Sequence, residues 1–198
     1  DSKRIRLVLL AKNLEGYRNL IKLLTASYLE GFYYKPRIDK ELLEKHAEGL
    51  VCIVPSFSGN IAQALKMSDK VKALEHLSFY KKHFPGCAGR PDLYLEITHH
   101  PEIDNHEELM KQIKALAKET NTPLVAAHDV YYLEPEDKRA VTTLRSVQKS
   151  YGASIGQDDE GDFSFISSEQ AEELFAEEPE ALENAHKIAM EICDCKLP

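Results

Sequence analysis

Four histidines lie near the ends of predicted elements and are the first candidates for metal binding: His99, His100, His106 and His128. Imidazole nitrogens are common ligands for zinc and other transition metals. His99 and His100 are adjacent on a predicted strand, so their side chains point to opposite faces and cannot easily share one ion. The same problem separates His128 from Asp129. We therefore interpret these histidines as surface or hydrogen-bonded side chains.

An acidic run in the C-terminal part of the chain suggests a calcium loop. It contains Asp158, Asp159, Glu160 and Asp162, but Phe163 stands where an EF-hand loop needs its glycine. We interpret this run as a solvated loop. The sequence contains no P-loop, dinucleotide fingerprint, nucleophile elbow or HExxH motif, so no catalytic residue is predicted.

The elements that would position such residues alternate along the chain. Short apolar runs predict strands at residues 7–10, 50–54, 93–97 and 124–127. Amphipathic segments predict helices at 13–30, 39–47, 60–83 with a break near Ser68, 104–120, and from about Pro135. This alternation favours an α/β fold with a parallel sheet or part of a β/α barrel, although four strands are too few to close one.

The first predicted helix has a cap at Asn13 and a natural stop at Gly31. Its apolar positions follow a spacing of three to four residues, and we expect them to form core rather than interface: Leu14, Tyr17, Leu20, Ile21, Leu24 and Tyr28.

The C-terminal part has a different pattern, because it predicts short helices without strands between them. We divide the chain into β/α units at residues 1–151, a loop at 152–162 and a helical extension at 163–198. Ser167 and Gln170 form a predicted capping box, and Pro179 opens a last helix. The apolar face of that helix is predicted to contain Leu182, Ala185, Ala189 and Ile192.

Charge and composition limit the partners. The formal net charge is −8, whereas DNA-binding surfaces are usually basic, so this chain is a poor candidate for the main DNA-binding surface. No apolar run is long enough to span a bilayer, and no secretion leader is visible, so no membrane association is expected. The spacing of the four cysteines (Cys52, Cys87, Cys193 and Cys195) fits no disulfide framework, which favours the cytoplasm.

Several blocks resemble one family in the same order along the chain. They are LVLLAKNLEGYRNLIKLLTASYLEGFYYKPRID at 7–39, YLEITHHP at 94–101, LVAAHDVYYL at 124–133 and FSFISSEQAEELFAEEPEALENAHKIAMEIC from Phe163. These blocks resemble the PHP (polymerase and histidinol phosphatase) domain of bacterial DNA polymerase III alpha subunits, the C-family replicative polymerases. The resemblance implies the later part of a PHP-type distorted β/α barrel, followed by helices that lead towards the palm.

The resemblance also identifies four positions at which the family has metal ligands. They are occupied here by Arg6, Ser56, Asp129 and Tyr131, and only Asp129 retains a good ligand. Arginine is always cationic, while serine and neutral tyrosine are weak ligands for zinc or manganese. We therefore predict a vestigial site without metal, in which Arg6 pairs with Asp129.

The resemblance implies a fragment of a DNA-directed DNA polymerase (a nucleotidyltransferase of DNA replication) whose Mg²⁺-binding catalytic carboxylates lie in the palm, beyond Pro198. This fragment would hold no cofactor and would serve as scaffold and docking surface. Its partners would be the rest of the polymerase chain, a proofreading exonuclease and other replisome proteins, with DNA contacted by other domains.

Two alternatives stay open: an active metal-dependent PHP phosphoesterase or 3′–5′ exonuclease completed by upstream ligands, and a stand-alone interaction module. Missing opening strands would also expose a sheet edge, so dimers or poor solubility are expected.

Overall fold

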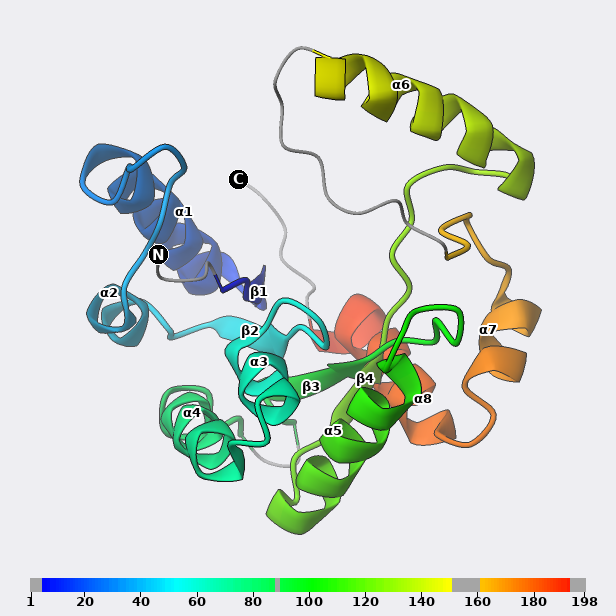
Figure 1. Ribbon diagram of the computed structural model, residues 1–198. Helices are drawn as coiled ribbons and strands as arrows, with labels where there is room; N and C mark the ends of the chain where they lie inside the picture. The colour runs from blue at the N-terminus through cyan, green and yellow to red at the C-terminus, as the bar shows by residue number, and fades with distance from the viewer. Residues whose placement is uncertain (1–4, 88–89, 151–160, 193–198) are drawn as a thin grey trace.

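A computed structural model describes residues 5–87, 90–150 and 161–192 of the chain (Figure 1). The strands are β1 (Val8–Ala11), β2 (Leu50–Val54), β3 (Leu93–Ile97) and β4 (Leu124–Ala126). The helices are α1 (Leu14–Leu29), α2 (Lys40–Lys45), α3 (Asn60–Lys66), α4 (Lys70–His83), α5 (His106–Thr120), the 3₁₀ helix η1 (Pro135–Asp137), α6 (Lys138–Ser150), α7 (Ser168–Leu174), α8 (Pro179–Lys187) and the π-helical η2 (Ile188–Ile192). The fold is thus α/β, as predicted.

The four strands form one sheet in the order β1-β2-β3-β4. β2, β3 and β4 are parallel, but β1 is antiparallel to β2, so the expectation of a wholly parallel sheet is wrong. The reason lies in the connection. After α1 has run back along β1, residues 30–39 and α2 carry the chain to the other end of the sheet. There Lys12 N–H donates to the Gly49 carbonyl at 2.9 Å, beside the start of β2.

The two faces of the sheet have different covers. On one face, α1 to α5 enclose the main core, with α3, α4 and α5 below the sheet in the view of Figure 1. On the other face, Ile188 packs against Val51, Tyr94 and Val125, and Ala185 and Ile192 lie against this cluster. The predicted apolar face of the last helix is correct only in part: Leu182, Ala185 and Ile192 pack against the core, but Ala189 is exposed, and the buried residues are Ala181 and Ile188. Pro179 is the first residue of α8, as predicted.

Capping side chains and residues with special backbone conformations determine where several helices begin and end. The side chain of Asn13 accepts from the Gly16 N–H at 2.9 Å, and Ser167 and Gln170 form the predicted capping box. Ser68 separates α3 from α4 with a φ of 56°, a left-handed conformation that cannot continue a helix. Gly31 is needed because a Cβ there would lie 2.0 Å from the Arg37 carbonyl oxygen.

The predicted core face of α1 is wrong. The residues that α1 buries are Gly16, Asn19, Leu23 and Ser27. The expected core residues Leu14, Ile21, Leu24 and Tyr28 are 38 to 58% exposed, Tyr17 and Leu20 being partly buried. A Cβ on Gly16 would lie 1.9 Å from the Gly49 carbonyl oxygen, so this glycine lets the helix backbone touch the chain before β2. Close backbone approach, rather than side-chain hydrophobicity, therefore selects the face.

Some predicted features fall outside the described residues: most of the 152–162 loop with Asp158, Asp159 and Glu160, and both Cys193 and Cys195. The two described cysteines, Cys52 and Cys87, are free. None of the described helices combines the length and the apolar character needed to cross a membrane.

Candidate functional site

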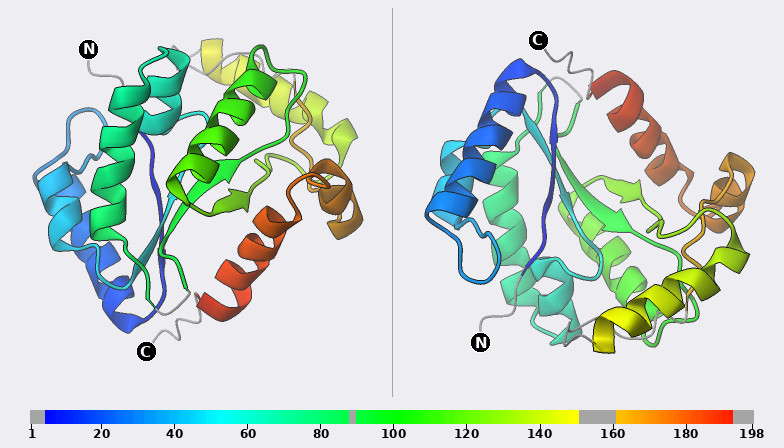
Figure 2. Two further views of the ribbon diagram at one scale, coloured as in Figure 1. Left: turned by 90° about the horizontal axis from the view of Figure 1, so that it is seen from below. Right: turned by 90° about the horizontal axis from the view of Figure 1, so that it is seen from above.

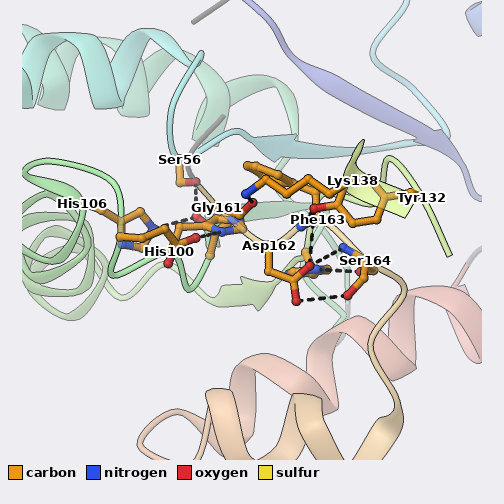
Figure 3. Close-up of polar contacts among 12 residues, drawn as sticks. Ser56, His100, His106, Tyr132, Lys138, Gly161, Asp162, Phe163 and Ser164 are labelled. Carbon is orange, nitrogen blue, oxygen red and sulfur yellow. Dashed lines mark hydrogen bonds and ion pairs between the residues drawn. The ribbon is translucent and has the colours of Figure 1, made fainter. Parts of the chain in front are cut away.

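The candidate site lies at the carboxyl ends of β2, β3 and β4, where functional groups gather in parallel sheets (Figure 3). The chain leaving β2 contributes Ser56, the end of β3 contributes Glu96, Thr98 and His100, and the chain leaving β4 contributes His128. His106, the first residue of α5, joins them.

A chain of hydrogen bonds links three of these elements. The backbone N–H and the hydroxyl of Ser56 both donate to Glu96 Oε1, at 2.8 and 2.9 Å. Thr98 Oγ1 lies 3.1 Å from Ser56 Oγ and 3.1 Å from His106 Nε2. Because the one proton of Ser56 is given to Glu96, Thr98 donates to Ser56, and His106 donates to Thr98. This order assigns the proton of a neutral His106 to Nε2.

Burial shifts two pKa values in this chain. Desolvation lowers the pKa of His106 to about 4, and the nearby His100 and His99 add to the effect. Desolvation also raises the pKa of Glu96, against the two hydrogen bonds from Ser56 and with help from the charge of Asp129. Both shifts favour the neutral forms of these two side chains.

His100 is almost fully enclosed, with 1% of its surface exposed. Its Nδ1 lies 3.2 Å from Glu102 Oε1, while its buried Nε2 has no hydrogen-bond partner within the part of the chain that the structure describes. Its ring lies 5.5 Å from the ring of His128 and 5.8 Å from that of His106, centroid to centroid. His99 is exposed, which agrees with the predicted opposite orientation of the two neighbours.

Residues 161–165, here called the closing segment, lie across these side chains. Main-chain bonds join the segment to the chain after β4: Tyr131 N–H donates to the Phe163 carbonyl at 2.9 Å, and Phe165 N–H donates to the Leu133 carbonyl at 3.1 Å. The Tyr132 hydroxyl accepts from the Phe163 N–H at 2.9 Å. The closing segment is therefore held like an added strand.

Side chains secure both ends of the closing segment. His128 Nε2 lies 2.9 Å from the Ser164 carbonyl oxygen, and Lys138 Nζ donates to the Gly161 carbonyl at 2.9 Å. Asp162 accepts from the backbone N–H and the hydroxyl of Ser164, at 3.0 and 3.1 Å. Although its partial burial opposes this, these hydrogen bonds lower the pKa of Asp162.

Phe163 fills the space between the strand ends and the closing segment (Figure 3). Its ring is 4.8 Å from that of His100 and 4.9 Å from that of Tyr131, and the residue is only 5% exposed. The acidic loop that might have bound calcium thus ends in the residue that seals the pocket.

The four predicted vestigial positions are only partly gathered here. Ser56 is fully buried in the hydrogen-bond chain, and Tyr131 packs on Phe163, with the Arg145 guanidinium 5.0 Å from its ring centroid. Asp129 is exposed. Arg6 donates its backbone N–H to the Ser58 carbonyl at 3.1 Å, but no Arg6–Asp129 ion pair within 4.0 Å occurs among the described residues. The predicted pairing is therefore not found.

Glu96 and Thr98 were not identified from the sequence as residues of the candidate site. The signal was present, because Leu93, Leu95 and Ile97 alternate on the core face and so place Glu96 and Thr98 together on the other face. Across the described ranges, no group of three or more His, Cys, Asp or Glu side chains is arranged to hold a metal ion. In this arrangement the buried Phe163 ring lies 4.8 Å from the ring of His100.

Comparisons with known proteins agree with the sequence blocks. The chain is similar to the DNA polymerase III subunit alpha of Borreliella burgdorferi, at 37% identity over 198 residues covering 96% of this chain and 16% of that protein. It is 35% identical to that of Treponema pallidum over 97% of this chain and 16% of that protein, and 38% identical to that of Aquifex aeolicus over 75% and 12%.

The chain therefore spans about 16% of the length of the first two relatives. Among protein families, the PHP domain matches residues 1–100, about half of the 198 residues. Together with the mixed α/β fold, this match shows that the chain belongs to the PHP domain family.

Proposed function

We propose that this chain is part of a bacterial replicative polymerase alpha subunit and that its PHP domain acts as a scaffold rather than as a hydrolase. The observation that carries the proposal is the closing segment, which puts the Phe163 ring on His100 at the strand ends. A PHP hydrolase needs this space for metal ions, water and a phosphodiester.

The chemistry of the remaining groups supports the same conclusion. The Ser56 hydroxyl donates its hydrogen bond to Glu96. A lowered pKa keeps His106 neutral, and its Nε2 is hydrogen-bonded to Thr98. Metal-ion hydrolysis requires several side-chain ligands, such as neutral imidazoles and carboxylates, whose free lone pairs converge on one point. Ser56, Glu96, Thr98 and His106 instead hydrogen-bond to one another, which makes these four residues supports of the fold.

In the parent enzyme, DNA synthesis would depend on carboxylates and Mg²⁺ in the palm, and this region would stabilise the polymerase. The four-stranded sheet would be part of a larger β/α barrel. A proofreading exonuclease and other replisome proteins would dock on the assembled enzyme in the cytoplasm, with DNA held by other domains.

One observation favours the alternative, a metal-dependent PHP phosphoesterase. Among the described residues the buried Nε2 of His100 has no hydrogen-bond partner, and the ring centroids of His106 and His128 lie 5.8 and 5.5 Å from that of His100. If the closing segment moved away, these nitrogens would be available as ligands.

Metal analysis and a nuclease assay separate the two functions. The chain is incubated with Mn²⁺ or Zn²⁺, desalted, and assayed for bound metal and for hydrolysis of single-stranded DNA. We expect neither bound metal nor hydrolysis that EDTA abolishes. Stoichiometric metal together with EDTA-sensitive hydrolysis that His100→Ala removes would refute the scaffold proposal. Phe163→Ala, with the exposed Phe165→Ala as its matched control, tests whether opening the pocket alone restores binding.

A further inference from the structure

The connection between α1 and α2 displays aromatic rings to solvent. Residues 32–38, here called the aromatic loop, run along the outer edge of the molecule (Figures 1 and 2). Phe32, Tyr33 and Tyr34 are 56, 64 and 82% exposed. Burial of an aromatic ring normally stabilises a fold, so three consecutive exposed rings indicate a surface that contacts another molecule.

The backbone of Tyr34 gives a second indication. Its φ is 60°, in the left-handed region, where glycine or asparagine is usual and a bulky side chain is uncommon. The turn therefore does not require a tyrosine, and glycine would form it with less strain. Strain that is retained at an exposed side chain is typical of a residue that serves contact rather than stability.

The aromatic loop holds its rings in place with its own contacts. The Tyr33 N–H donates to the Lys35 carbonyl at 3.2 Å, and the Arg37 guanidinium donates to the Tyr33 carbonyl at 3.3 Å. The rings of Tyr33 and Tyr34 meet edge to face, with their centroids 4.7 Å apart. All of these contacts lie within residues 33–37, so the shape of the loop does not depend on what adjoins the described chain.

Two cations accompany the rings. The aromatic loop, FYYKPRI, contains Lys35 and Arg37 and no acidic residue, so one lysine and one arginine give it a formal charge of +2 in a chain of −8. The Arg37 guanidinium lies 5.4 Å from the centroid of the Tyr33 ring. Among the described residues, neither cation has a carboxylate oxygen within 4.0 Å. A ligand that covers the loop must therefore offer flat apolar faces together with negative charge.

We propose that the aromatic loop is a contact site for single-stranded DNA. A base would stack on the Tyr34 ring, which Tyr33 supports, and the flanking phosphates would pair with Lys35 and Arg37. A single strand carries unpaired bases and phosphates in alternation, the combination that aromatic and basic side chains bind without sequence preference. A duplex would keep only the phosphate contacts, because its bases are stacked on one another.

The contact would be an auxiliary one, added to the DNA contacts expected of other domains. A chain of net charge −8 repels a polyanion, and two cations offset that repulsion only locally. Two phosphate contacts to a single strand predict that log Kd rises with log salt concentration with a slope of about 1.4. The choice of DNA over RNA rests on the proposed polymerase identity, whereas the chemistry of the loop does not.

Fluorescence anisotropy of labelled oligo(dT), titrated with the 198-residue chain at low salt, tests the proposal. We expect a Kd on the order of 100 μM, which Tyr34→Gly should weaken about tenfold, whereas Tyr34→Phe should preserve it. Glycine suits the left-handed backbone, so Tyr34→Gly should stay folded, as urea unfolding checks. Phe165→Ala is the matched control, because Phe165 is also an exposed ring, at 68%, but lies in the closing segment.

The salt dependence gives a second readout. Replacing both cations, as Lys35→Gln with Arg37→Gln, should weaken binding and reduce the slope from about 1.4 to near zero. Lys72→Gln, at an exposed lysine on α4, should leave both the affinity and the slope unchanged.

Three results would count against the proposal. Absence of binding to both oligo(dT) and oligo(rU), or binding that Tyr34→Gly leaves unchanged, would overturn the site itself. Equal affinity for a duplex of the same length would overturn the stacking arrangement. Tighter binding of oligo(rU), still weakened by Tyr34→Gly, would overturn the choice of DNA and the polymerase identity behind it, while the loop would remain a nucleic-acid contact.

Discussion

The strand-end pocket and the β1–α1 edge are opposites in how they treat apolar surface. At the pocket, the closing segment brings Phe163 onto polar residues and leaves only 5% of it exposed. At the edge, α1 presents leucine, isoleucine and tyrosine side chains to solvent while it buries glycine, asparagine and serine. The difference teaches that a ring from a distant segment can be buried among polar groups, whereas apolar side chains on a helix stay exposed when a backbone contact turns them outward.

The largest expected effect is at the pocket. Phe163→Ala should reduce the free energy of unfolding by about 3 kcal/mol, because it leaves a cavity against His100 and Tyr131. Chemical denaturation measures the change. Phe165→Ala, at a residue 68% exposed, should cost about 0.5 kcal/mol. Equal losses in the two variants would show that the pocket is not sealed as described.

Acid should weaken the pocket specifically. The pKa of folded His106, about 4, is below its unfolded value near 6.5, so the unfolded chain binds more protons between these values. The contribution of neutral His106 is therefore complete above pH 6.5 and is lost as the pH falls, by about 2 kcal/mol at pH 5. Glu96, with its raised pKa, works in the opposite direction at lower pH.

Comparing the chain with His106→Gln isolates this contribution, because glutamine does not titrate but can still donate to Thr98. The variant should lose less stability than the parent between pH 7 and pH 5 in urea unfolding. Parallel losses would mean that another group causes the acid sensitivity.

An intermediate effect is expected from the hydrogen-bond chain. Ser56→Ala removes the hydroxyl that the buried Thr98 and the partly buried Glu96 share, which should cost about 2 kcal/mol, although the backbone N–H of residue 56 still donates to Glu96. A double-mutant cycle with Thr98→Val measures the coupling, and strict additivity would show that the two hydroxyls do not interact.

The smallest effect belongs to the open edge. In dilute solution, Leu24→Ala should change the free energy of unfolding by less than about 0.5 kcal/mol, whereas Leu116→Ala, in the core and 2% exposed, should cost about 3 kcal/mol. A large loss in dilute solution would mean that α1 buries Leu24 within the monomer.

Sequence periodicity predicted where strands and helices occur better than it predicted strand direction or which helix face is buried. β2 and β3 match the predicted strands at 50–54 and 93–97 because their apolar runs are short and bounded. The antiparallel β1 could not be foreseen, since its direction depends on the path of residues 30–39. Periodicity showed that α1 has an apolar face, but the contact between Gly16 and Gly49 turned that face outward.

The site was predictable only in outline. The resemblance brought Ser56 and Tyr131 to attention, and strand alternation could have added Glu96 and Thr98. The closing segment could not be predicted, because the contact of Phe163 with His100 joins residues more than sixty positions apart and follows no local pattern. Arg6 and Asp129 were paired on charge alone, which ignores where the backbone places them.

The meeting of Gly16 and Gly49 has a consequence for how this helix tolerates sequence change. Main-chain atoms, not side chains, set the depth at which α1 sits on the sheet. Replacements along its outer side should leave that depth constant. Homologues can therefore remodel what α1 presents to its surroundings without disturbing the core beneath it, provided that both glycines remain.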